Sequence, residues 1–351
     1  MNIYDISKAS GVSIATVSRV INRSGYVSEK TRRKVQKAID EYEYIPNAFA
    51  RGMSRSTMSN IGILSPDSRD PYQADVIYHL QEKLHQAGYS AILCCVHPDL
   101  SGCASQISLL LSRNVDAIVC IGSAFASSQP AVREEIGQAA RKVPVFILNG
   151  SVDSPNVYSI YCDEKDGMKD LTEKVIVSGS RNPVFLMSRK SQSNLAKQAG
   201  FEQALAEHQI SVSPSRILLS SRSLGAIEKD LDDFFRDHWA DAILCADDYL
   251  AVLVLHYLLK NRISVPESVQ LSGFNGSQIS RTSWPEITTC DSQVEFLAQS
   301  CVSGIRSVLE KQTFPQKTAY SGSIIERATT RPAAPSVPDQ KNSTHLRKGT
   351  Q

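Results

Sequence analysis

The fold of the first part of the chain is decided by the stretch Gly11-Val12-Ser13-Ile14-Ala15-Thr16-Val17-Ser18-Arg19-Val20-Ile21-Asn22. Gly11 can adopt the positive φ that a tight turn between two helices requires. Ser13 is a favourable N-cap, because its hydroxyl can accept a hydrogen bond from an amide in the first helical turn. Val17, Val20 and Ile21 follow at i, i+3 and i+4 spacing, so they form an apolar stripe that packs inward. We therefore predict a turn followed by a short amphipathic helix.

The outward face of this helix consists of small, mostly uncharged side chains around one arginine, Arg19. Its other members are Ile14, Ala15, Ser18 and Asn22. Arginine can pair with a guanine edge in the major groove of DNA, and small apolar groups can contact the methyl group of thymine. The face therefore suits a DNA recognition helix, although an ordinary amphipathic surface helix would show the same two-sided pattern.

Helices are also predicted on both sides of this stretch. Asn2 followed by Asp5 is typical of an N-cap with an acidic third residue, and it begins a first helix that runs to about Ala9. Ser28 begins a third helix that runs to about Tyr42. The inward face of the third helix is expected to carry Val35, Ala38, Ile39 and Tyr42. Three short helices with glycine in the first turn match the helix-turn-helix plan.

The residues in and around these helices match a known family at specific positions. The matching residues are Ile3-Tyr4-Asp5-Ile6, Ala9, Gly11-Val12-Ser13, Thr16-Val17-Ser18-Arg19-Val20, Asn22, Val27-Ser28 and Tyr44-Ile45-Pro46-Asn47-Ala48-Phe49-Ala50-Arg51. On these residues, the segment 1–60 closely resembles the headpiece of the LacI/GalR family of bacterial transcriptional repressors. The resemblance extends, more diffusely, to about residue 331.

The resemblance implies a sequence-specific transcriptional repressor. It would be a homodimer that places two recognition helices in successive major grooves of a palindromic operator. Arg19 would read a guanine edge, and Ile14 and Ala15 would contact thymine methyl groups. Contacts to DNA phosphates are expected from Tyr4, Ser13, Thr16, Ser18, Asn22 and Tyr26. Operator affinity would be controlled by a small-molecule effector bound in the core of the protein.

The segment 46–54 begins with proline, which is favoured in the first turn of a helix, but it is too short to form a stable helix alone. In the LacI/GalR family such a segment is a hinge helix that orders on the operator and inserts an apolar side chain into the minor groove. The hinge residues expected to contact DNA are Asn47, Ala50 and Met53. Met53 takes the wedge position, where the family usually has leucine, and methionine can also insert between base steps. A flexible linker is the alternative interpretation.

The composition is that of a soluble globular protein, with 351 residues of which 42% are hydrophobic and 21% charged. Residues 1–60 contain ten Lys and Arg and five Asp and Glu, a net charge of +5, whereas the other 28 basic and 31 acidic residues give −3. A basic N-terminal end fits a part of the molecule that contacts phosphate. No apolar run approaches the roughly 20 residues that span a bilayer, and no signal-peptide pattern is present. We therefore expect a cytoplasmic, nucleoid-associated protein with no membrane partner.

The eight cysteines give no indication of a metal site or a disulfide. They are Cys94, Cys95, Cys103, Cys120, Cys162, Cys245, Cys290 and Cys301. None forms a C-x-x-C pair, and most lie in apolar runs that are typical of strands. We predict buried, reduced thiols, and no cofactor.

From residue 61 onward, apolar runs typical of strands alternate with helical stretches. The runs are 61–64, 91–96, 117–121 and 145–148, followed by a second set at 184–187, 217–219, 242–246 and 269–274. This alternation predicts two lobes, each with a doubly wound parallel sheet, and a cleft between them. The resemblance likewise implies a core like that of a periplasmic binding protein. The chain would then cross between lobes near residues 162–163, 290–292 and 321–323, and a helix at 293–311 would return it to the first lobe.

These observations predict four parts of the chain. They are an all-α helix-turn-helix headpiece (1–45), a hinge helix with linker (46–59), a two-lobed effector-binding and dimerisation core (60–331) and a tail (332–351). Lobe 1 would contain residues 60–162 and 292–320, and lobe 2 residues 163–290 and 322–331. The tail is polar and proline-rich, so we expect it to be disordered. It lacks the leucine heptads of a tetramerising coil, so a dimer is expected.

Ligands of open α/β lobes bind beyond the carboxyl ends of the strands. That rule selects the segments 65–73, 123–125, 149–150, 188–197, 247–248 and 275–276. The candidate effector-binding residues within them are Tyr72, Gln73, Asn149, Ser193, Lys197, Asp247 and Asn275. Carboxylates, amides and one cation around an aromatic ring suit a sugar or a sugar derivative.

Four of these candidates depart from the usual residues of the family. Asn149 and Asn275 replace aspartates, Lys197 replaces an arginine and Asp247 replaces an asparagine. Since an ammonium group lacks the planar fork of arginine, the ligand of a particular family member cannot be carried over to this chain. Each candidate could also be an ordinary loop residue or a helix cap; Asp248 in particular could N-cap the helix that follows it.

Two alternatives share the same fold: an enzyme, and a sugar-binding sensor without DNA regulation. The pair Asp247-Asp248 could serve catalysis, but neighbouring residues in a turn usually point apart. The chain has no G-x-G-x-x-G, Walker A, G-x-S-x-G or H-E-x-x-H motif, so we expect no enzyme. The intact run from Thr16 to Arg19 argues against a sensor that does not bind DNA. A protein co-regulator in place of a small molecule stays open.

Overall fold

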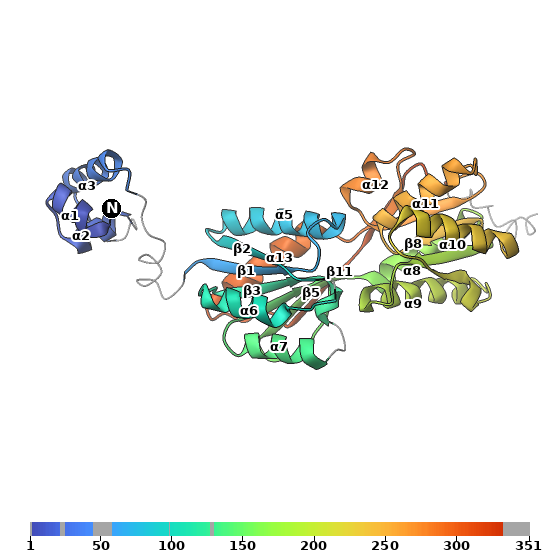
Figure 1. Cartoon of the computed structure of the whole chain (residues 1–351), viewed down its shortest axis with the longest axis horizontal. Helices are drawn as coiled ribbons and strands as arrows, with labels where there is room; N and C mark the ends of the chain where they lie inside the picture. Colours follow the sequence, from blue (N-terminus) through green and yellow to red (C-terminus); the bar gives the residue numbers. More distant parts are fainter. Residues whose placement is uncertain (1, 22–24, 45–57, 98, 127–129, 333–351) are drawn as a thin grey trace, which may run out of the picture.

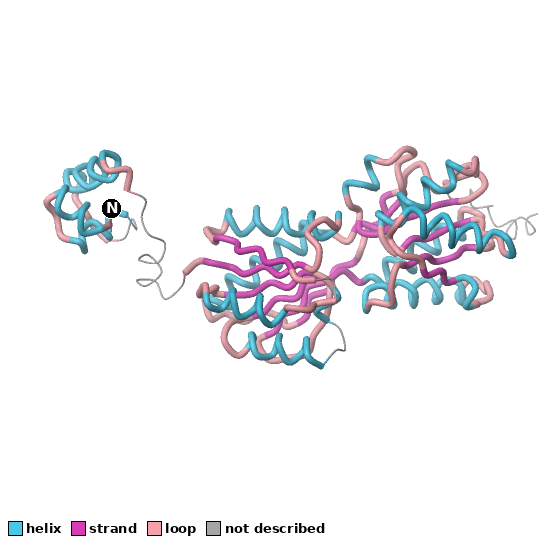
Figure 2. Tube along the Cα trace, in the orientation of Figure 1, coloured by secondary structure: helices cyan, strands magenta, loops and turns pink. Residues whose placement is uncertain are grey.

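The structure is a computed structural model that describes residues 2–21, 25–44, 58–97, 99–126 and 130–332. Within these residues the chain forms a small helical headpiece and a core of two α/β lobes (Figures 1 and 2). The fold class predicted from the sequence is thereby confirmed. The predicted hinge helix lies outside the described residues, and so does the tail from residue 333 onward.

The headpiece helices are α1 (Ile3–Ser10), α2 (Ile14–Ile21) and α3 (Glu29–Glu41). The side chain of Asn2 caps α1 in a capping box, and the backbone N–H of Asn2 donates a hydrogen bond to the Asp5 carboxylate at 2.9 Å. Gly11 ends α1 with φ at 65°, as the predicted turn requires. The amide of Thr16 donates to the hydroxyl of Ser13 at 3.2 Å, so the predicted N-cap of α2 is confirmed.

The three headpiece helices enclose a small apolar core. Its buried members are Ile6, Val17, Val20, Val35, Ala38 and Tyr44. The expectation that Tyr42 faces inward is wrong, because α3 ends at Glu41 and Tyr42 becomes its C-cap, with 42% of its surface exposed. The chain then turns back, and the amide of Tyr44 donates to the carbonyl of Ile39 at 2.9 Å. Tyr44 therefore fills the position that Tyr42 was expected to fill.

Lobe 1 contains a six-stranded sheet in the order β11-β5-β4-β3-β1-β2, and every pairing in it is parallel. Its strands are β1 (Asn60–Ser65), β2 (Ser90–Cys95), β3 (Ala117–Ile121), β4 (Val145–Leu148), β5 (Val157–Asp163) and β11 (Lys317–Ser321). One face is covered by α5 (Pro71–Gln86) and α13 (Val294–Leu309), and the other by α6 (Cys103–Ser112) and α7 (Pro130–Ala140) (Figure 1). The short 3₁₀ helix η1 (Ser123–Ala126) follows β3. The central strands are buried on both faces, which explains their continuous apolar runs.

Lobe 2 repeats this plan in the order β12-β10-β9-β8-β6-β7, with β12 antiparallel to β10. Its strands are β6 (Pro183–Met187), β7 (Ile217–Leu219), β8 (Ala242–Cys245), β9 (Gln270–Asn275), β10 (Thr288–Asp291) and β12 (Ser323–Ile325). Its helices are α8 (Glu164–Val177), α9 (Gln192–Glu207), η2 (Pro214–Arg216), α10 (Leu224–Asp237), α11 (Asp248–Lys260) and α12 (Gln278–Thr282). Figure 1 shows α8 and α9 on one face of the sheet and α10 and α11 on the other.

The chain passes from one sheet to the other at three places. It leaves lobe 1 between β5 and α8, returns between β10 and α13, and leaves again between β11 and β12 at Gly322. A Cβ atom on Gly322 would lie 2.5 Å from the sulfur of Cys290 and 3.5 Å from that of Cys162. Only glycine fits at this point without displacing its neighbours, because side-chain atoms from two crossing segments already fill the space.

The cysteines are free thiols, as predicted, and all but one are buried. The exception is Cys95, which is exposed because it follows the buried Cys94 on strand β2 and alternate residues point to opposite faces. Burial raises the pKa of the thiol of Cys162 to about 12. Among the helices that the structure describes, none is long and apolar enough to cross a membrane.

Candidate effector site and DNA-binding surface

A cavity lies where the carboxyl ends of the strands of the two lobes face each other. Its volume is about 80 Å³, and a second cavity of about 180 Å³ adjoins it through the shared residues Ser123, Asn149 and Ser193. The structure brings all the predicted effector-binding residues into the wall of the first cavity: Tyr72, Gln73, Asn149, Ser193, Lys197, Asp247 and Asn275. The wall thus collects side chains that are up to about 200 residues apart in the sequence, as the strand-end rule requires.

Lys197 forms part of the cavity wall, but its ammonium group is held by protein groups. The side chain is 4% exposed, and Nζ donates to the carbonyl of Ala246 at 3.0 Å. Nζ also lies 3.2 Å from Oε1 of Glu164 and 4.4 Å from the centroid of the Phe274 ring. A buried cation requires such partners, since desolvation would otherwise prevent its burial.

Glu164 joins the predicted residues to each other, although the sequence analysis did not select it. Its Oε1 accepts hydrogen bonds from the Ser193 hydroxyl at 2.6 Å and from Nδ2 of Asn149 at 3.2 Å. Asn149 belongs to lobe 1, whereas Glu164, Ser193 and Lys197 belong to lobe 2. The strand before Glu164, β5, was not predicted, so the strand-end rule did not reach this residue.

Close packing of α8 against α9 holds Glu164 within reach of Ser193 and Lys197. A Cβ atom on Gly200 would lie 2.0 Å from the backbone carbonyl oxygen of Lys165, so the two helix backbones touch at this glycine. Glu164 begins α8, and Ser193 and Lys197 lie in the first two turns of α9. The contact of the helices therefore sets the distances within the ion pair and its hydrogen bonds.

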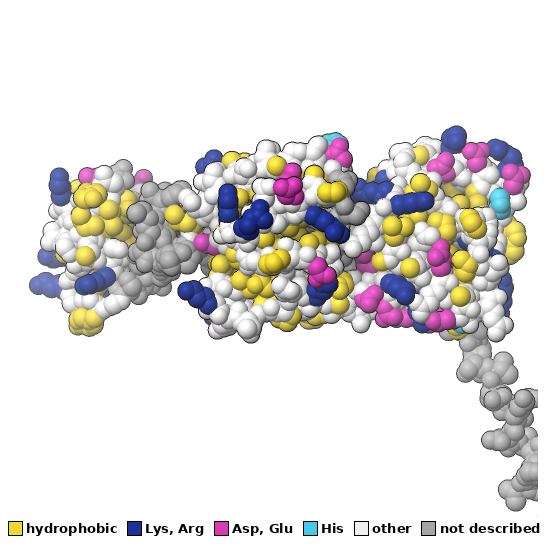
Figure 3. Space-filling model, turned by 90° about the horizontal axis from the view of Figure 1, so that it is seen from below, with side chains coloured by type: hydrophobic (Ala, Val, Ile, Leu, Met, Phe, Trp, Pro, Cys, Tyr) yellow, Lys and Arg dark blue, Asp and Glu magenta, His cyan; other side chains and the backbone are white. Residues whose placement is uncertain are grey.

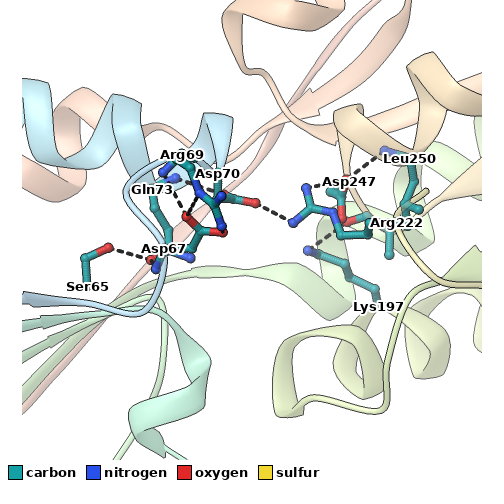
Figure 4. Close-up of polar contacts among 10 residues, drawn as sticks. Ser65, Asp67, Arg69, Asp70, Gln73, Lys197, Arg222, Asp247 and Leu250 are labelled. Atoms are coloured by element: carbon teal, nitrogen blue, oxygen red, sulfur yellow. Dashed lines mark hydrogen bonds and ion pairs between the residues drawn. The ribbon is translucent and has the colours of Figure 1, made fainter. Parts of the chain in front are cut away.

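Gln73 supports the loop at the end of β1 and contributes no free amide oxygen. Its Oε1 accepts from the Ser65 hydroxyl at 2.7 Å and from the amide of Asp67 at 3.2 Å. The backbone N–H of Gln73 donates to Oδ1 of Asp70 at 3.0 Å, which makes Asp70 the N-cap of α5 (Figure 4). Gln73 is therefore a wall residue that fixes the shape of the loop.

Asp70 and Arg222 were not among the predicted site residues, yet both line the cavity. Arg222 lies in the loop after β7 and forms ion pairs with Asp70, at 2.5 Å, and with Asp247, at 3.3 Å (Figure 4). The run 217–219 was predicted as a strand, so the loop behind it could have been selected by the same rule as the other segments. Asp70 lies inside the selected segment 65–73 but was not singled out.

Several buried polar atoms around the cavity have no hydrogen-bond partner among the described residues. They are Oδ1 of Asn149, Oδ1 of Asn275 and Nε of Arg222. Buried polar groups are almost always paired in folded proteins, so such a cluster needs an explanation. Asn149 and Asn275 also have positive φ values, 58° and 106°, a strained backbone region that is common at functional sites. Burial raises the pKa of the Tyr72 phenol, so Tyr72 carries its proton and can donate it in a hydrogen bond.

Asp247 and Asp248 have separate environments, as expected for neighbours in a turn. Asp247 faces the cavity and N-caps α11 by accepting from the amide of Leu250 at 2.9 Å. The interpretation of Asp248 as that N-cap is wrong, because Asp248 is the first helical residue and is buried away from the cavity. It accepts from the hydroxyl of Thr289 at 2.6 Å and from the amide of Ser277 at 2.7 Å. Burial outweighs these hydrogen bonds and raises the pKa of Asp248 to about 7.

The candidate DNA-binding residues that the structure describes lie on the headpiece, and several of them expose apolar or aromatic surface. Tyr4, Ile14 and Tyr26 are 61%, 38% and 92% exposed. Ala15 and Arg19 are also exposed, whereas Ser18 and Thr16 are partly buried. Lys and Arg side chains project from the headpiece in Figure 3. Asn22, Asn47, Ala50 and Met53 lie outside the described residues.

Arg19 and the Ser13–Thr16 pair differ in how strongly the protein holds them. The hydroxyls of Ser13 and Thr16 lie 2.9 Å apart, in hydrogen-bond distance, at the start of α2. The side chain of Arg19 passes close to Gly25, where an added Cβ would lie 3.7 Å from Cδ of Arg19. Arg19 is therefore an exposed cation whose aliphatic stem lies close to Gly25.

A helix-turn-helix headpiece, followed in the chain by a two-lobed α/β core with a polar cavity between the lobes, defines a ligand-binding transcriptional regulator. Comparison with known proteins agrees with this class. A family model described as "Bacterial regulatory proteins, lacI family" matches residues 2–47, and one described as "Periplasmic binding proteins and sugar binding domain of LacI family" matches residues 58–316. The chain belongs to the LacI family of DNA-binding transcriptional regulators.

Individual relatives support this assignment along nearly the whole chain. An "HTH-type transcriptional regulator" of Lachnoclostridium phytofermentans is 37% identical over 331 residues, which cover 94% of this chain and 99% of the relative. The "HTH-type transcriptional regulator DegA" of Bacillus subtilis is 25% identical, over 94% of this chain and 98% of the relative. These relatives are named as regulators and not as enzymes. The family predicted from the headpiece residues is thus confirmed.

Solved structures share the fold at lower identity. The lac repressor dimer bound to operator and the anti-inducer ONPF matches with a TM-score of 0.83 at 22% identity, over 94% of this chain and 99% of that one. A complex of the transcriptional regulator CelR with cellobiose matches with a TM-score of 0.68 at 19% identity, over the same shares of the two chains. Both likenesses concern the arrangement of the helices and strands.

Proposed function

We propose that this LacI-family regulator is a repressor that binds a palindromic operator as a homodimer, and that a sugar or sugar derivative in the interlobe cavity controls its operator affinity. The observation that carries the effector part is the group of buried polar atoms without partners around that cavity. A bound molecule with hydroxyl groups would satisfy them. The regulator would act at the nucleoid, in the cytoplasm.

The chemistry of the unpaired atoms favours a ligand rich in hydroxyl groups. The Oδ1 atoms of Asn149 and Asn275 can only accept hydrogen bonds, so they need donors on the ligand. Nε of Arg222 can only donate, and the Tyr72 hydroxyl, which also lines the cavity, can donate or accept. Hydroxyl groups supply both functions. The complex of CelR with cellobiose provides a precedent for a transcriptional regulator of this fold that binds a sugar.

A thermal-shift screen of the full chain tests the effector. The panel contains neutral sugars, sugar phosphates, nucleosides and purines. A ligand at about 100 times its dissociation constant should add roughly 2.7 kcal/mol of apparent stability. The variant Asn275→Ala should lose the shift, whereas Asn261→Ala, on the far end of α11, should keep it. A panel without any sugar that shifts the transition would contradict the proposal and favour a protein co-regulator.

The proposed DNA contacts divide into those that read bases and those that position the protein. Arg19, Ile14 and Ala15 are assigned to base edges. Tyr4, Ser13, Thr16, Ser18, Asn22 and Tyr26 are assigned to phosphates, and Asn47, Ala50 and Met53 to the minor groove at the operator centre. The logarithm of operator affinity should fall steeply with the logarithm of salt concentration, because phosphate contacts release counterions. A flat salt dependence in a mobility-shift titration would refute this assignment.

The proposed homodimer would use lobe 1, where an edge strand carries apolar surface. Strand β2 ends the lobe 1 sheet, so within the described part of the chain one of its sides has no neighbouring strand, and its Leu93 is 38% exposed. The helix α5, which packs beside β2, presents Tyr78 with 63% of its surface exposed. Exposed edges and apolar side chains are expected to be covered in an assembly.

The proposed boundaries of the parts of the chain remain 1–45, 46–59, 60–331 and 332–351.

A further inference from the structure

One cation links the two lobes across the cavity. Arg222 lies in the loop between β7 and α10, just before the N-cap Ser223. Its Nη1 is 2.5 Å from Oδ2 of Asp70, which belongs to lobe 1, and its Nη2 is 3.3 Å from Oδ1 of Asp247, which belongs to lobe 2 (Figure 4). The guanidinium group also lies over the ring of Tyr249, with Cζ 4.8 Å from the ring centroid.

Both carboxylates are fixed in place by backbone amides. Oδ1 of Asp70 accepts from the amide of Gln73 at the start of α5, which leaves Oδ2 for Arg222. Oδ1 of Asp247 accepts both from the amide of Leu250, at the start of α11, and from Arg222. Helix N-termini favour negative charge, so both positions suit the side chain of an aspartate. Arg222 therefore finds its partners already oriented.

The ion pair is shielded from solvent more than a surface pair. The side chains of Arg222, Asp70 and Asp247 are 31%, 12% and 17% exposed. Electrostatic attraction is stronger in such a partly buried position than on the surface, where screening by water leaves little net stabilisation. Loss of the ion pair between Asp70 and Arg222 should therefore produce a measurable change in the distance between the lobes.

The side chain of Arg222 also occupies space in the cavity. The two adjoining cavities measure about 80 and 180 Å³, and each is below the roughly 300 Å³ at the lower end of ligand pockets. Arg222 retains one donor, Nε, that is buried and has no partner among the described residues. The same side chain can thus hold the lobes and offer a hydrogen bond to a molecule between them.

We propose that Arg222 is an interlobe latch: through Asp70 and Asp247 it holds the cleft closed, and its Nε positions an acceptor oxygen of the effector. This inference rests on the proposed function only in its second part. The first part concerns the protein alone. Because the effector would bond to Nε while Nη1 and Nη2 keep their aspartates, it would bind best to the latched arrangement, and this difference in affinity would shift the relation of the lobes.

The latch is tested by measuring the distance between the lobes in the full chain without any ligand. In a Cys95→Ser background, spin labels are attached to Lys142→Cys in lobe 1 and Asp237→Cys in lobe 2, two positions that are exposed. Labelled chains are diluted with unlabelled chains so that pairs within one chain dominate. The dipolar distance distribution is expected to shift to longer values and to broaden in Arg222→Gln.

A second variant keeps the test valid if Arg222→Gln folds poorly. Asp70→Asn removes the lobe 1 charge but retains a good N-cap for α5. It should produce the same lengthening, and the double variant Asp70→Asn with Arg222→Gln should add nothing further, because both changes break one bond. The matched control is Arg69→Gln. It breaks the neighbouring ion pair of Arg69 with Asp67, at 3.0 Å within lobe 1, and should leave the distance unchanged.

Two results would overturn the latch: unchanged distances in both Arg222→Gln and Asp70→Asn, or an equal lengthening in Arg69→Gln. Effector positioning is read separately, with the sugar found by the thermal-shift screen as probe. Arg222→Lys retains a cation but lacks Nε, so its affinity for that sugar should fall about tenfold or more, the equivalent of one hydrogen bond. An unchanged affinity would overturn this part. Because the distance measurement uses no ligand, failure of the screen leaves the result on the latch intact.

Discussion

Lys197 and Asn275 lie on the same cavity wall but differ in what they offer a ligand. The ammonium group of Lys197 is already bonded to the Ala246 carbonyl and paired with Glu164. Oδ1 of Asn275 is buried and has no hydrogen-bond partner in the part of the chain that the structure describes. Lys197 therefore stabilises the wall, and Asn275 is a candidate for direct contact. The family usually has arginine at the position of Lys197, so here an ammonium group paired with Glu164 replaces a planar guanidinium group. The family usually has aspartate at the position of Asn275, so here a neutral amide oxygen replaces a carboxylate.

At the residue scale, the base-reading role of Arg19 can be separated from its charge. Arg19→Ala should cost roughly 1–3 kcal/mol in operator affinity and should relax base preference at one position in each half-site. The measurement is a mobility-shift series with every single-base operator variant. Lys37→Ala, which removes the same charge from an exposed position of α3, should change affinity without changing base preference. If Arg19→Ala weakened all operator variants equally, the base-reading role would be wrong.

Asp248 gives a prediction for pH dependence. The pKa of this buried carboxyl is raised from an ordinary value of 3.8 to about 7, so the folded state binds its proton more tightly than the unfolded state does. Its stabilising contribution is complete below pH 4 and is lost as pH rises through 7, a decrease of at most about 4 kcal/mol in the free energy of unfolding. Urea unfolding between pH 4 and 8 should show this decrease, most of it between pH 4 and 7, on top of the contributions of the other titrating groups.

The variant Asp248→Asn isolates the contribution of that one group. Asparagine can still accept from Ser277 and can donate to the Thr289 hydroxyl, so the site stays bonded. The free energy of unfolding of Asp248→Asn should depend less steeply on pH than that of the unaltered protein over the same range. An identical slope in the two proteins would show that the carboxyl of Asp248 titrates near its ordinary pKa.

At the scale of elements, the effector site depends on how closely α8 approaches α9. Glu164 at the start of α8 has to reach both Ser193 and Lys197 on α9. That reach exists because Gly200 allows the two backbones to touch. The contact is a packing feature, but its consequence is chemical: it brings a carboxylate within hydrogen-bond distance of the cavity wall.

Gly200→Ala should therefore be strongly destabilising. Its Cβ would lie 2.0 Å from the carbonyl oxygen of Lys165, a backbone atom that cannot rotate away, so the helices would have to separate. We expect a loss of about 3 kcal/mol or more in urea unfolding, at the upper end for overpacking. Gly137→Ala is the control: nothing lies within 4 Å of its Cβ inside α7, so it should stabilise by about 0.5–1 kcal/mol. Equal effects of the two changes would contradict the close contact.

The elements that the sequence predicted are those with a clear apolar signal. The runs at 61–64, 91–96, 117–121 and 145–148 became β1 to β4, and the second set became β6 to β9. Strands β5, β10, β11 and β12 were not predicted. β10 reads Thr-Thr-Cys-Asp, and its buried threonines are accommodated by hydrogen bonds, for example from Thr289 to Asp248. Since such bonds connect residues 41 positions apart, a local pattern cannot indicate them.

The site was predicted from the rule that ligands bind beyond the carboxyl ends of the strands. The prediction was incomplete because the rule reaches only residues that follow a predicted strand. Residues that follow predicted strands, such as Asn149 and Asn275, were found because the carboxyl ends of parallel strands converge. Glu164 was missed with its strand β5. Arg222 looked like one more charge in a polar loop, and only the fold shows that Asp70, 152 residues away in sequence, is its partner.

At the scale of the whole molecule, the proposed homodimer makes a direct prediction about the edge of lobe 1. Leu93→Glu would place a charge on exposed apolar surface of the edge strand β2, and we expect it to shift the full chain from dimer toward monomer in sedimentation velocity. Operator affinity should fall with it, since one headpiece reads only half of a palindrome. Val212→Glu, at a comparably exposed valine of lobe 2, should leave a dimer. Dimers in both variants would place the interface elsewhere.

The three crossings between the lobes have a consequence for synthesis on the ribosome. The core of lobe 1 needs both α5 and α13, which pack against each other, and its sheet needs β11. α13 begins about 200 residues after α5 ends, which at about 5–20 residues per second is roughly 10–40 s of translation. The apolar face of α5 is thus without its final cover while all of lobe 2 except β12 emerges. The first lobe to be started is completed almost last, so the nascent chain has a defined interval in which chaperones would have to protect it.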